Sequence, residues 1–291
     1  MIPHVLMTRR LPEAVISEAL KRFELTIRED TAPMTEDEAA AALHAYDAIL
    51  PTLGDGFTGA VLSRAHAPRC RMLANFGVGY NHIDVAAAGA AGIVVSNTPG
   101  AVTDATADIA LTLILMTARR AAEGERLVRA GAWEGWHPTQ MLGAHVTGKR
   151  LGVIGMGRIG QAIARRCHHG FGMEIRFFNR SRVESVPQVP AARQVETLAE
   201  AMAADFVVIA VPGGAGTRHL INAEALAAMP SHGILVNIAR GDVVDEAALI
   251  AALEAGQIAG AGLDVYEYEP HVPPALRALE RAVLLPHLGT A

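Results

Sequence analysis

The sequence predicts an α/β protein with a doubly wound parallel sheet in its longer, second part. Three observations support this fold class: short apolar runs alternate with helical segments, a glycine-rich turn joins one such pair, and polar residues follow several later runs. Apolar runs of about four to eight residues are typical of strands that a parallel sheet buries on both faces. The chain has 291 residues, enough for two domains with separate cores.

Residues 1–98 are predicted to form the smaller α/β domain. Thr35 and Glu38 have the spacing of a capping box, which marks the start of a helix. The turn-rich segment Asn97–Gly100 marks the end of this domain. Its expected strands are Val5–Met7, Ala48–Pro51, Met72–Phe76 and Ile93–Ser96, and its expected helices are Leu11–Arg22 and Thr35–Leu43.

One long apolar helix is expected from about Thr103 to Ala130, before a segment that holds both tryptophans, Trp133 and Trp136. The length of this helix suits a connector or a dimer-forming element. Two indoles on an exposed loop indicate an interface more often than a cofactor site. Residues 103–145 are therefore expected to contribute to a homodimer.

A glycine turn follows the apolar run Leu151–Ile154. Gly155, Gly157 and Gly160 fit G-x-G-x-x-G, and apolar residues recur behind them at helical spacing. Strand, turn and helix thus follow in the order that dinucleotide binding requires, with the diphosphate at the positive end of the helix dipole. These flanks favour binding over a merely structural turn and predict a Rossmann domain over residues 99–291. The predicted cofactor contacts here are Gly155, Gly157, Arg158, Ile159 and Gly160.

Further strands and helices are expected to complete this sheet. The expected strands are Arg176–Asn179, Phe206–Val211, Ile234–Ile238, Ile258–Val265 and Val283–Leu285, and a helix is expected over Asp245–Ala255, ended by Gly256. Val211 and Ile238, at the ends of two of these strands, are also assigned to the cofactor site.

The tip of the second strand carries no carboxylate. NAD sites place an acidic residue roughly 20 positions past the first glycine, where it binds the ribose hydroxyls. Here Asn179, Arg180, Ser181 and Arg182 offer an amide, a hydroxyl and two guanidinium groups, which suit a 2′-phosphate, although a solvated turn is the alternative. Glu174 has nearly the right spacing but precedes the expected strand. We expect NADP(H) to be preferred and NAD(H) to be possible, with Asn179, Arg180 and Ser181 at the cofactor.

Composition limits the partners. The formal net charge is −5 and charges of both signs are mixed along the chain, so neither a nucleic acid nor a membrane surface is expected. No window approaches the roughly 18 apolar residues of a membrane helix, and residues 1–10 lack a long apolar signal core. Cys70 and Cys167 have no metal-ligand spacing, so we expect buried or incidental thiols, no metal site and a reducing cytoplasm.

Arg240, Glu269 and His287 each follow an apolar strand of the second domain. They are expected at the sheet edge that carries the glycine turn, where open α/β sheets bind their ligands. Taken singly, a histidine after a strand is more often structural, and an arginine before Gly241 could belong only to a turn. Taken together beside a dinucleotide, they suit an anion clamp, an orienting carboxylate and an acid.

The combined motifs resemble the D-isomer-specific 2-hydroxyacid dehydrogenases over nearly the whole chain. The segments that carry the resemblance are Asn75–Asp84, Gly92–Gly100, Gly155–Gly160, Asn237–Asp242, Gly262–Pro270 and Pro286–Gly289. Within that family, Trp133–Pro138 and Asn179–Ser181 are most similar to the glyoxylate and hydroxypyruvate reductases. The resemblance implies a flavodoxin-like substrate domain beside the Rossmann domain.

The resemblance also implies a role for each polar residue. Reduction of a 2-keto acid needs a hydride at the carbonyl carbon and a proton at its oxygen. His287 would donate the proton, Glu269 would orient the ring, and Arg240 would bind the substrate carboxylate and polarise the carbonyl. The remaining implied contacts are backbone amides around Val78 and Gly79 to the carboxylate, Asp264 to the nicotinamide carboxamide, and Trp136 of a neighbouring subunit to the substrate.

Members of the family typically continue through a segment that packs back on the substrate domain, whereas this sequence stops at Ala291. We expect either a truncated chain or a substrate domain completed by its amino-terminal part alone.

The preferred function is an NADPH-dependent reductase of small 2-keto acids such as glyoxylate and hydroxypyruvate. One alternative is an NAD-linked dehydrogenase of D-lactate, D-glycerate or a bulkier D-2-hydroxy acid. Another is a nucleotide-sensing protein like the corepressors that share this fold, although Arg240, Glu269 and His287 together argue against a catalytically silent sensor. A formate-oxidising relative is disfavoured because formate oxidation needs no such acid.

Overall fold

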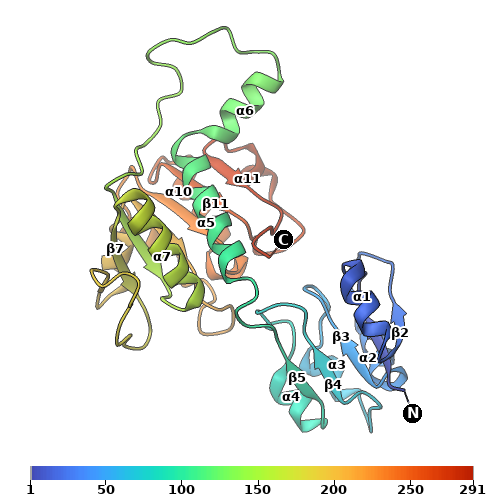
Figure 1. The fold of residues 1–291 in the computed structure, drawn as a ribbon. Coiled ribbons are helices and arrows are strands. Elements are labelled where there is room, and N and C mark those ends of the chain that lie inside the picture. The colour runs from blue at the N-terminus through green and yellow to red at the C-terminus, as the bar shows by residue number, and fades with distance from the viewer. Residues whose placement is uncertain (1, 291) are drawn as a thin grey trace. The chain divides into compact units, whose positions relative to one another are not determined.

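The computed structural model describes residues 2–290, so Ala291 lies outside the described residues. The chain divides into two compact units, Met1–Ala101 and Val102–Ala291. Each unit contains a parallel sheet with helices packed around it (Figure 1). No helix within residues 2–290 is long and apolar enough to cross a membrane.

The described part of unit 1 forms a five-stranded sheet in the order β2-β1-β3-β4-β5, which is the flavodoxin-like order. The capping box is confirmed, because the Thr35 side chain accepts from the Glu38 amide while the Glu38 carboxylate accepts from the Thr35 amide. One strand that we did not expect, β2, lies at the sheet edge, where no residue is fully buried. The elements are β1 His4–Met7, α1 Glu13–Leu20, β2 Glu24–Ile27, α2 Glu36–Ala45, β3 Ala48–Leu50, α3 Gly59–Ser63, β4 Met72–Ala74, α4 Val85–Ala90 and β5 Val94–Ser96.

The described part of unit 2 forms a seven-stranded sheet in the order β12-β11-β10-β9-β6-β7-β8. Apolar clusters that include Leu113, Ile163 and Leu253 bury both faces of this sheet, which explains why its strands read as continuous apolar runs. The strands are β6 Arg150–Ile154, β7 Glu174–Phe178, β8 Arg193–Gln194, β9 Phe206–Ile209, β10 Ile234–Asn237, β11 Gly260–Leu263 and β12 Ala282–Leu284. The helices are α5 Thr103–Ala118, α6 Ala121–Arg129, α7 Arg158–Phe171, α8 Leu198–Met202, α9 Ala223–Ala227, α10 Glu246–Glu254 and α11 Pro274–Ala278, with a short 3-10 turn at Gly241–Val243.

The strand ends of unit 2 are in register. Ile154 lies opposite both Phe178 and Ile209, and Asn237 lies opposite both Ile209 and Leu263. Since these strands are parallel, the segments that follow them all emerge at one edge of the sheet. We call this edge of unit 2 the carboxyl edge.

The single helix expected from Thr103 to Ala130 is wrong. The structure has two helices, α5 and α6, separated at Arg120, which takes a left-handed conformation with φ 52°. The Ala144 amide donates to the last carbonyl of α5, at Ala118, over 2.8 Å, and a side chain at Gly143 would collide with that carbonyl. The close approach of this distant segment ends α5, and α6 then extends with no buried residue (Figure 1).

Candidate active site

The glycine turn lies at the carboxyl edge between β6 and α7. Gly155 has φ 99°, and a Cβ atom there would lie 2.8 Å from the Ala210 carbonyl oxygen, so glycine is required. A Cβ atom at Gly157, in contrast, would meet nothing within 4 Å. Because α7 also begins without a side-chain cap, no capping side chain occupies its first amides, and these residues fit the diphosphate of a dinucleotide.

The other residues predicted near the glycine turn differ in exposure. Arg158 is exposed in the first turn of α7, whereas Ile159 is half-buried and packs against the core. Val211 lies beside Gly155, with its Cγ1 atom 2.8 Å from the position of a Cβ atom there. Ile238 directly follows β10 and is buried.

The tip of β7 carries the groups that we assigned to a 2′-phosphate. The Met156 amide donates to Asn179 Oδ1 over 3.3 Å, which ties this tip to the glycine turn. Arg180, Ser181 and Arg182 are exposed. Glu174 does not precede the strand, as we expected, but is its first residue, opposite Arg150. It therefore lies at the end of β7 remote from the glycine turn. This position, and not a place before the strand, is the reason for excluding Glu174 from the cofactor site.

His287 and Glu269 meet directly at the carboxyl edge. His287 Nδ1 lies 2.8 Å from Glu269 Oε2, and their side chains are 19% and 29% exposed. Burial would raise the pKa of Glu269, but the hydrogen bond and charge of His287, the Tyr266 amide and the charge of Arg240 outweigh it, so that pKa lies below its ordinary value. An ionised carboxylate accepts from Nδ1–H, which leaves Nε2 of His287 for proton transfer.

The backbone around His287 is held from two sides. The buried carboxylate of Asp264 accepts the amides of Leu288 and Gly289, each over 2.7 Å, and the Asp264 carbonyl accepts the His287 amide over 2.9 Å. Thr106 of α5 donates its hydroxyl to the Gly289 carbonyl over 2.6 Å. In the structure Asp264 thus orders the His287 segment, and its contact with a nicotinamide stays a prediction.

Arg240 lies in a tight turn at the end of β10. The Asn237 side chain accepts the Ala239 amide over 3.0 Å and donates to the Arg240 carbonyl over 2.9 Å, which closes the turn. A Cβ atom at Gly213 would lie 2.7 Å from Arg240 Cγ, so the arginine stem occupies the space that a side chain there would need. Burial lowers the pKa of Arg240, while the charges of Glu269 and Asp242 oppose this shift.

Val78 and Gly79 belong to unit 1, in the loop after β4. Asn75 Nδ2 donates to the carbonyls of Gly77 and Gly79 over 3.0 and 3.1 Å, and Asn97 Nδ2 donates to the Val78 carbonyl over 2.8 Å. These bonds shape the loop through its carbonyl groups. Its role as a carboxylate cradle stays a prediction.

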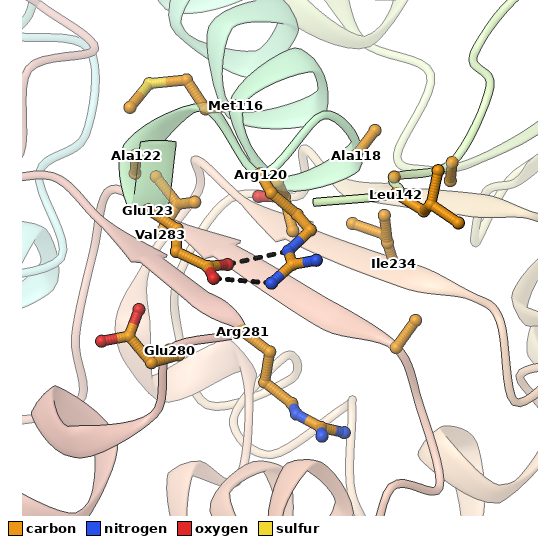
Figure 2. A pocket seen from close by; sticks show the side chains of 14 residues that line it. Met116, Ala118, Arg120, Ala122, Glu123, Leu142, Ile234, Glu280, Arg281 and Val283 are labelled. Carbon is orange, nitrogen blue, oxygen red and sulfur yellow. Dashed lines mark hydrogen bonds and ion pairs between the residues drawn. The ribbon is translucent and has the colours of Figure 1, made fainter. Parts of the chain in front are cut away.

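A cavity of about 450 Å³ lies away from the predicted reacting groups. Figure 2 shows its wall where α5 ends, with the Arg120 guanidinium paired to the Glu123 carboxylate over 2.6 and 2.8 Å. Ile234, the first residue of β10, and Ala259, which directly precedes β11, also line it. The cavity therefore belongs to the edge of the sheet opposite the carboxyl edge.

Sequence patterns alone identified some site residues and missed others. The structure brings Arg240, Glu269, His287 and Asp264 to the same sheet edge as the glycine turn. Trp136 is 79% exposed in the segment after α6. The supporting residues Thr106, Asn75 and Asn97 were missed, and only Asn75 and Asn97 stood within segments that the resemblance had marked.

Comparison with known proteins gives the family. A family model described as "D-isomer specific 2-hydroxyacid dehydrogenase, NAD binding domain" matches residues 111–289. The glyoxylate reductase of Thermococcus kodakarensis is 44% identical over 297 residues, covering 100% of this chain and 88% of that protein.

Solved structures agree with this assignment. A chain from Polaromonas sp. JS6 66 whose description names the same family has a TM-score of 0.91 at 38% identity, covering 100% of this chain and 91% of that one. The NADPH-dependent glyoxylate/hydroxypyruvate reductase of Sinorhizobium meliloti, solved with NADP and malonate, has a TM-score of 0.86 at 37% identity, covering 100% of this chain and 88% of that one. The chain belongs to the D-isomer specific 2-hydroxyacid dehydrogenase family and is an oxidoreductase that uses a nicotinamide cofactor.

Proposed function

We propose that this protein is an NADPH-dependent reductase of small 2-keto acids, with glyoxylate and hydroxypyruvate as its first substrates. The observation that carries this proposal is the 2.8 Å contact between His287 and Glu269, at the sheet edge that also carries Arg240 and the glycine turn. The names of relatives support the substrate class, since they include several glyoxylate reductases and one NADPH-dependent glyoxylate/hydroxypyruvate reductase.

The proposed mechanism assigns one task to each group. The nicotinamide, when bound, supplies the hydride for the carbonyl carbon. Arg240 binds the substrate carboxylate and polarises the carbonyl, while His287 gives the proton on Nε2 to the carbonyl oxygen. Glu269 stays ionised throughout and fixes the orientation of the imidazole ring through Nδ1. One keto acid, one hydride and one proton thus give one hydroxy acid.

The proposed division of labour follows the two domains. Residues 1–98 form the substrate domain, whose amides at Val78 and Gly79 bind the carboxylate, and residues 99–291 form the cofactor domain. Asp264 contacts the nicotinamide carboxamide in this proposal. What supports the cradle is that Asn75 and Asn97 already hold this loop in shape through its carbonyl groups.

The preference for NADPH rests on the tip of β7. Arg180 and Arg182 have no ion-pair partner among residues 2–290, so both guanidinium groups are available to a 2′-phosphate, and no carboxylate at 179–183 would repel it. The test is a panel of 2-keto acids assayed with NADPH and NADH in parallel. We expect the highest kcat/KM for glyoxylate or hydroxypyruvate with NADPH. A lower KM and higher kcat with NADH would contradict the cofactor preference and support the NAD-linked alternative.

We also propose a homodimer formed through residues 103–145. Support comes from exposed apolar side chains on this segment, with Val128 59%, Trp136 79% and Leu142 69% exposed. In that dimer, Trp136 of the partner reaches the substrate. A cytoplasmic location is proposed as well, since Cys70 and Cys167 are both free and buried. Light scattering during size-exclusion chromatography tests the dimer: a monomer mass would contradict it.

A further inference from the structure

We propose that Gln194 is the residue that sets the shape of the 2′-phosphate site, although it touches no phosphate itself. Gln194 lies on β8, whose pairing places it opposite Phe177 of β7. Its role is to hold the segment 179–183, which we call the tip loop, in one conformation. This inference rests on the proposed NADPH preference and adds a positioning residue to it.

The half-buried side-chain amide of Gln194 makes its hydrogen bonds to the tip loop. Its Nε2 donates to the Ser181 carbonyl over 3.1 Å and to the Asn179 carbonyl over 3.4 Å, and its Oε1 accepts the Val183 amide over 2.9 Å. One side chain thus holds both ends of the loop. A primary amide has two donor hydrogens and an acceptor oxygen, and this geometry uses all three groups.

Asn179 completes the frame from the other side. Its Nδ2 donates to the Ser181 carbonyl over 2.9 Å and to Ser181 Oγ over 3.2 Å, while its Oδ1 accepts the Met156 amide. The tip loop is therefore fixed both to β8 and to the glycine turn, the two features that frame the adenosine end of the site.

The consequence concerns the two arginines that the loop carries. Arg180 and Arg182 flank Ser181, so bonds that fix residues 179, 181 and 183 leave only their side chains to be ordered by an incoming anion. A loop that is already ordered loses less conformational entropy when it binds, which increases affinity. Removal of Gln194 should therefore weaken recognition of the 2′-phosphate without altering how the rest of the nucleotide binds.

The experiment compares two nucleotides that differ by one phosphate. Adenosine 2′,5′-bisphosphate and adenosine 5′-monophosphate are titrated by calorimetry into the whole protein and its variants Gln194→Ala and Gln194→Glu. Gln188→Ala, an exposed glutamine in the same connection, is the matched control. We expect a roughly tenfold loss of affinity for the bisphosphate in Gln194→Ala and a change below about twofold for the monophosphate.

Gln194→Glu should lose more affinity for the bisphosphate than Gln194→Ala. A carboxylate still accepts from the Val183 amide, but it cannot donate to the carbonyls of Asn179 and Ser181, and it adds an anion near the phosphate. In steady-state assays, KM for NADPH should rise while kcat is maintained. If the wild-type protein favours the bisphosphate and neither Gln194 variant changes that ratio, the role of Gln194 is wrong and the cofactor proposal stands. If the wild-type protein shows no preference for the bisphosphate, the NADPH proposal is wrong and the inference falls with it.

Discussion

His287 and Glu269 come from segments that follow different strands, β12 and β11, yet their side chains meet with Nδ1 and Oε2 only 2.8 Å apart. Asp264 lies behind this pair and accepts the two amides after His287, so the imidazole is positioned through both its ring and its backbone.

Glu269→Gln should reduce kcat for keto-acid reduction by roughly ten- to a hundredfold, because a neutral amide holds the imidazole ring through an uncharged and therefore weaker hydrogen bond. A kcat within about twofold of wild type would contradict the orienting role.

The thermal stability of the protein should also depend on the contact between Glu269 and His287. The pKa of Glu269 is depressed in the folded protein, so its stabilising contribution is complete above the ordinary glutamate pKa of about 4.3 and is lost as pH falls through the lower folded value. Wild type and Glu269→Gln should therefore differ in Tm at about pH 5 and converge as the pH falls through the folded pKa of Glu269.

Thr106→Val should lower kcat more than it changes KM for either substrate. The substitution keeps the shape of the side chain but removes the hydroxyl bonded to Gly289, which loosens the His287 segment and costs about 1 kcal/mol of stability. Thr112→Val is the control, since Thr112 also lies on α5 but donates its hydroxyl to the Asp108 carbonyl of its own helix. Equal effects of both variants on kcat would contradict a link between α5 and the reacting histidine.

Gly213→Ala should raise KM for the keto acid by roughly tenfold or more while changing KM for the cofactor little. The added methyl group would lie 2.7 Å from Arg240 Cγ and force the guanidinium away from its position. Gly216→Ala is the matched control in the same loop, because a Cβ atom there would meet nothing within 4 Å. If KM for the keto acid is unchanged in Gly213→Ala, Arg240 is not the carboxylate ligand.

Asp205→Asn should destabilise the fold by about 2 kcal/mol at neutral pH. Burial would raise the pKa of Asp205, but the Arg150 amide, His232 and the Arg150 guanidinium lower it to about 2. Because the pKa of Asp205 falls from 3.8 to about 2 on folding, the ionised carboxylate stabilises the fold. This stabilisation is fully present above about pH 4 and is lost as pH falls toward 2. Denaturant titrations at several pH values measure this, with the exposed Glu184→Gln as control. A difference that persists unchanged at pH 2 would exclude the ionic explanation.

The sequence patterns predicted the carboxyl edge well for a physical reason. Strands buried on both faces are mostly apolar, so polar residues gather just beyond their carboxyl ends, as at Asn179, Arg240 and His287. A fixed glycine spacing likewise marks the β6–α7 turn. Both signals are local, so they can be recognised in the sequence without knowledge of the tertiary structure.

The failures arise where a distant segment decides the outcome. The helix break at Arg120 depends on Gly143 and Ala144, which contact the end of α5. No helix-breaking residue next to Arg120 in the sequence predicts this break. The edge strand β2 is only partly buried and gave no apolar run. Gln194 and Thr106 act through hydrogen bonds across 13 and 183 positions of sequence, which no periodicity can reveal.

The central claim is that His287 supplies the proton during reduction, and the turnover of His287→Ala tests it most directly. We predict that kcat for glyoxylate falls at least about a hundredfold, while the dissociation constant for NADPH, measured by fluorescence titration, stays within about twofold of wild type. A correctly folded His287→Ala variant with near-normal kcat would contradict the account.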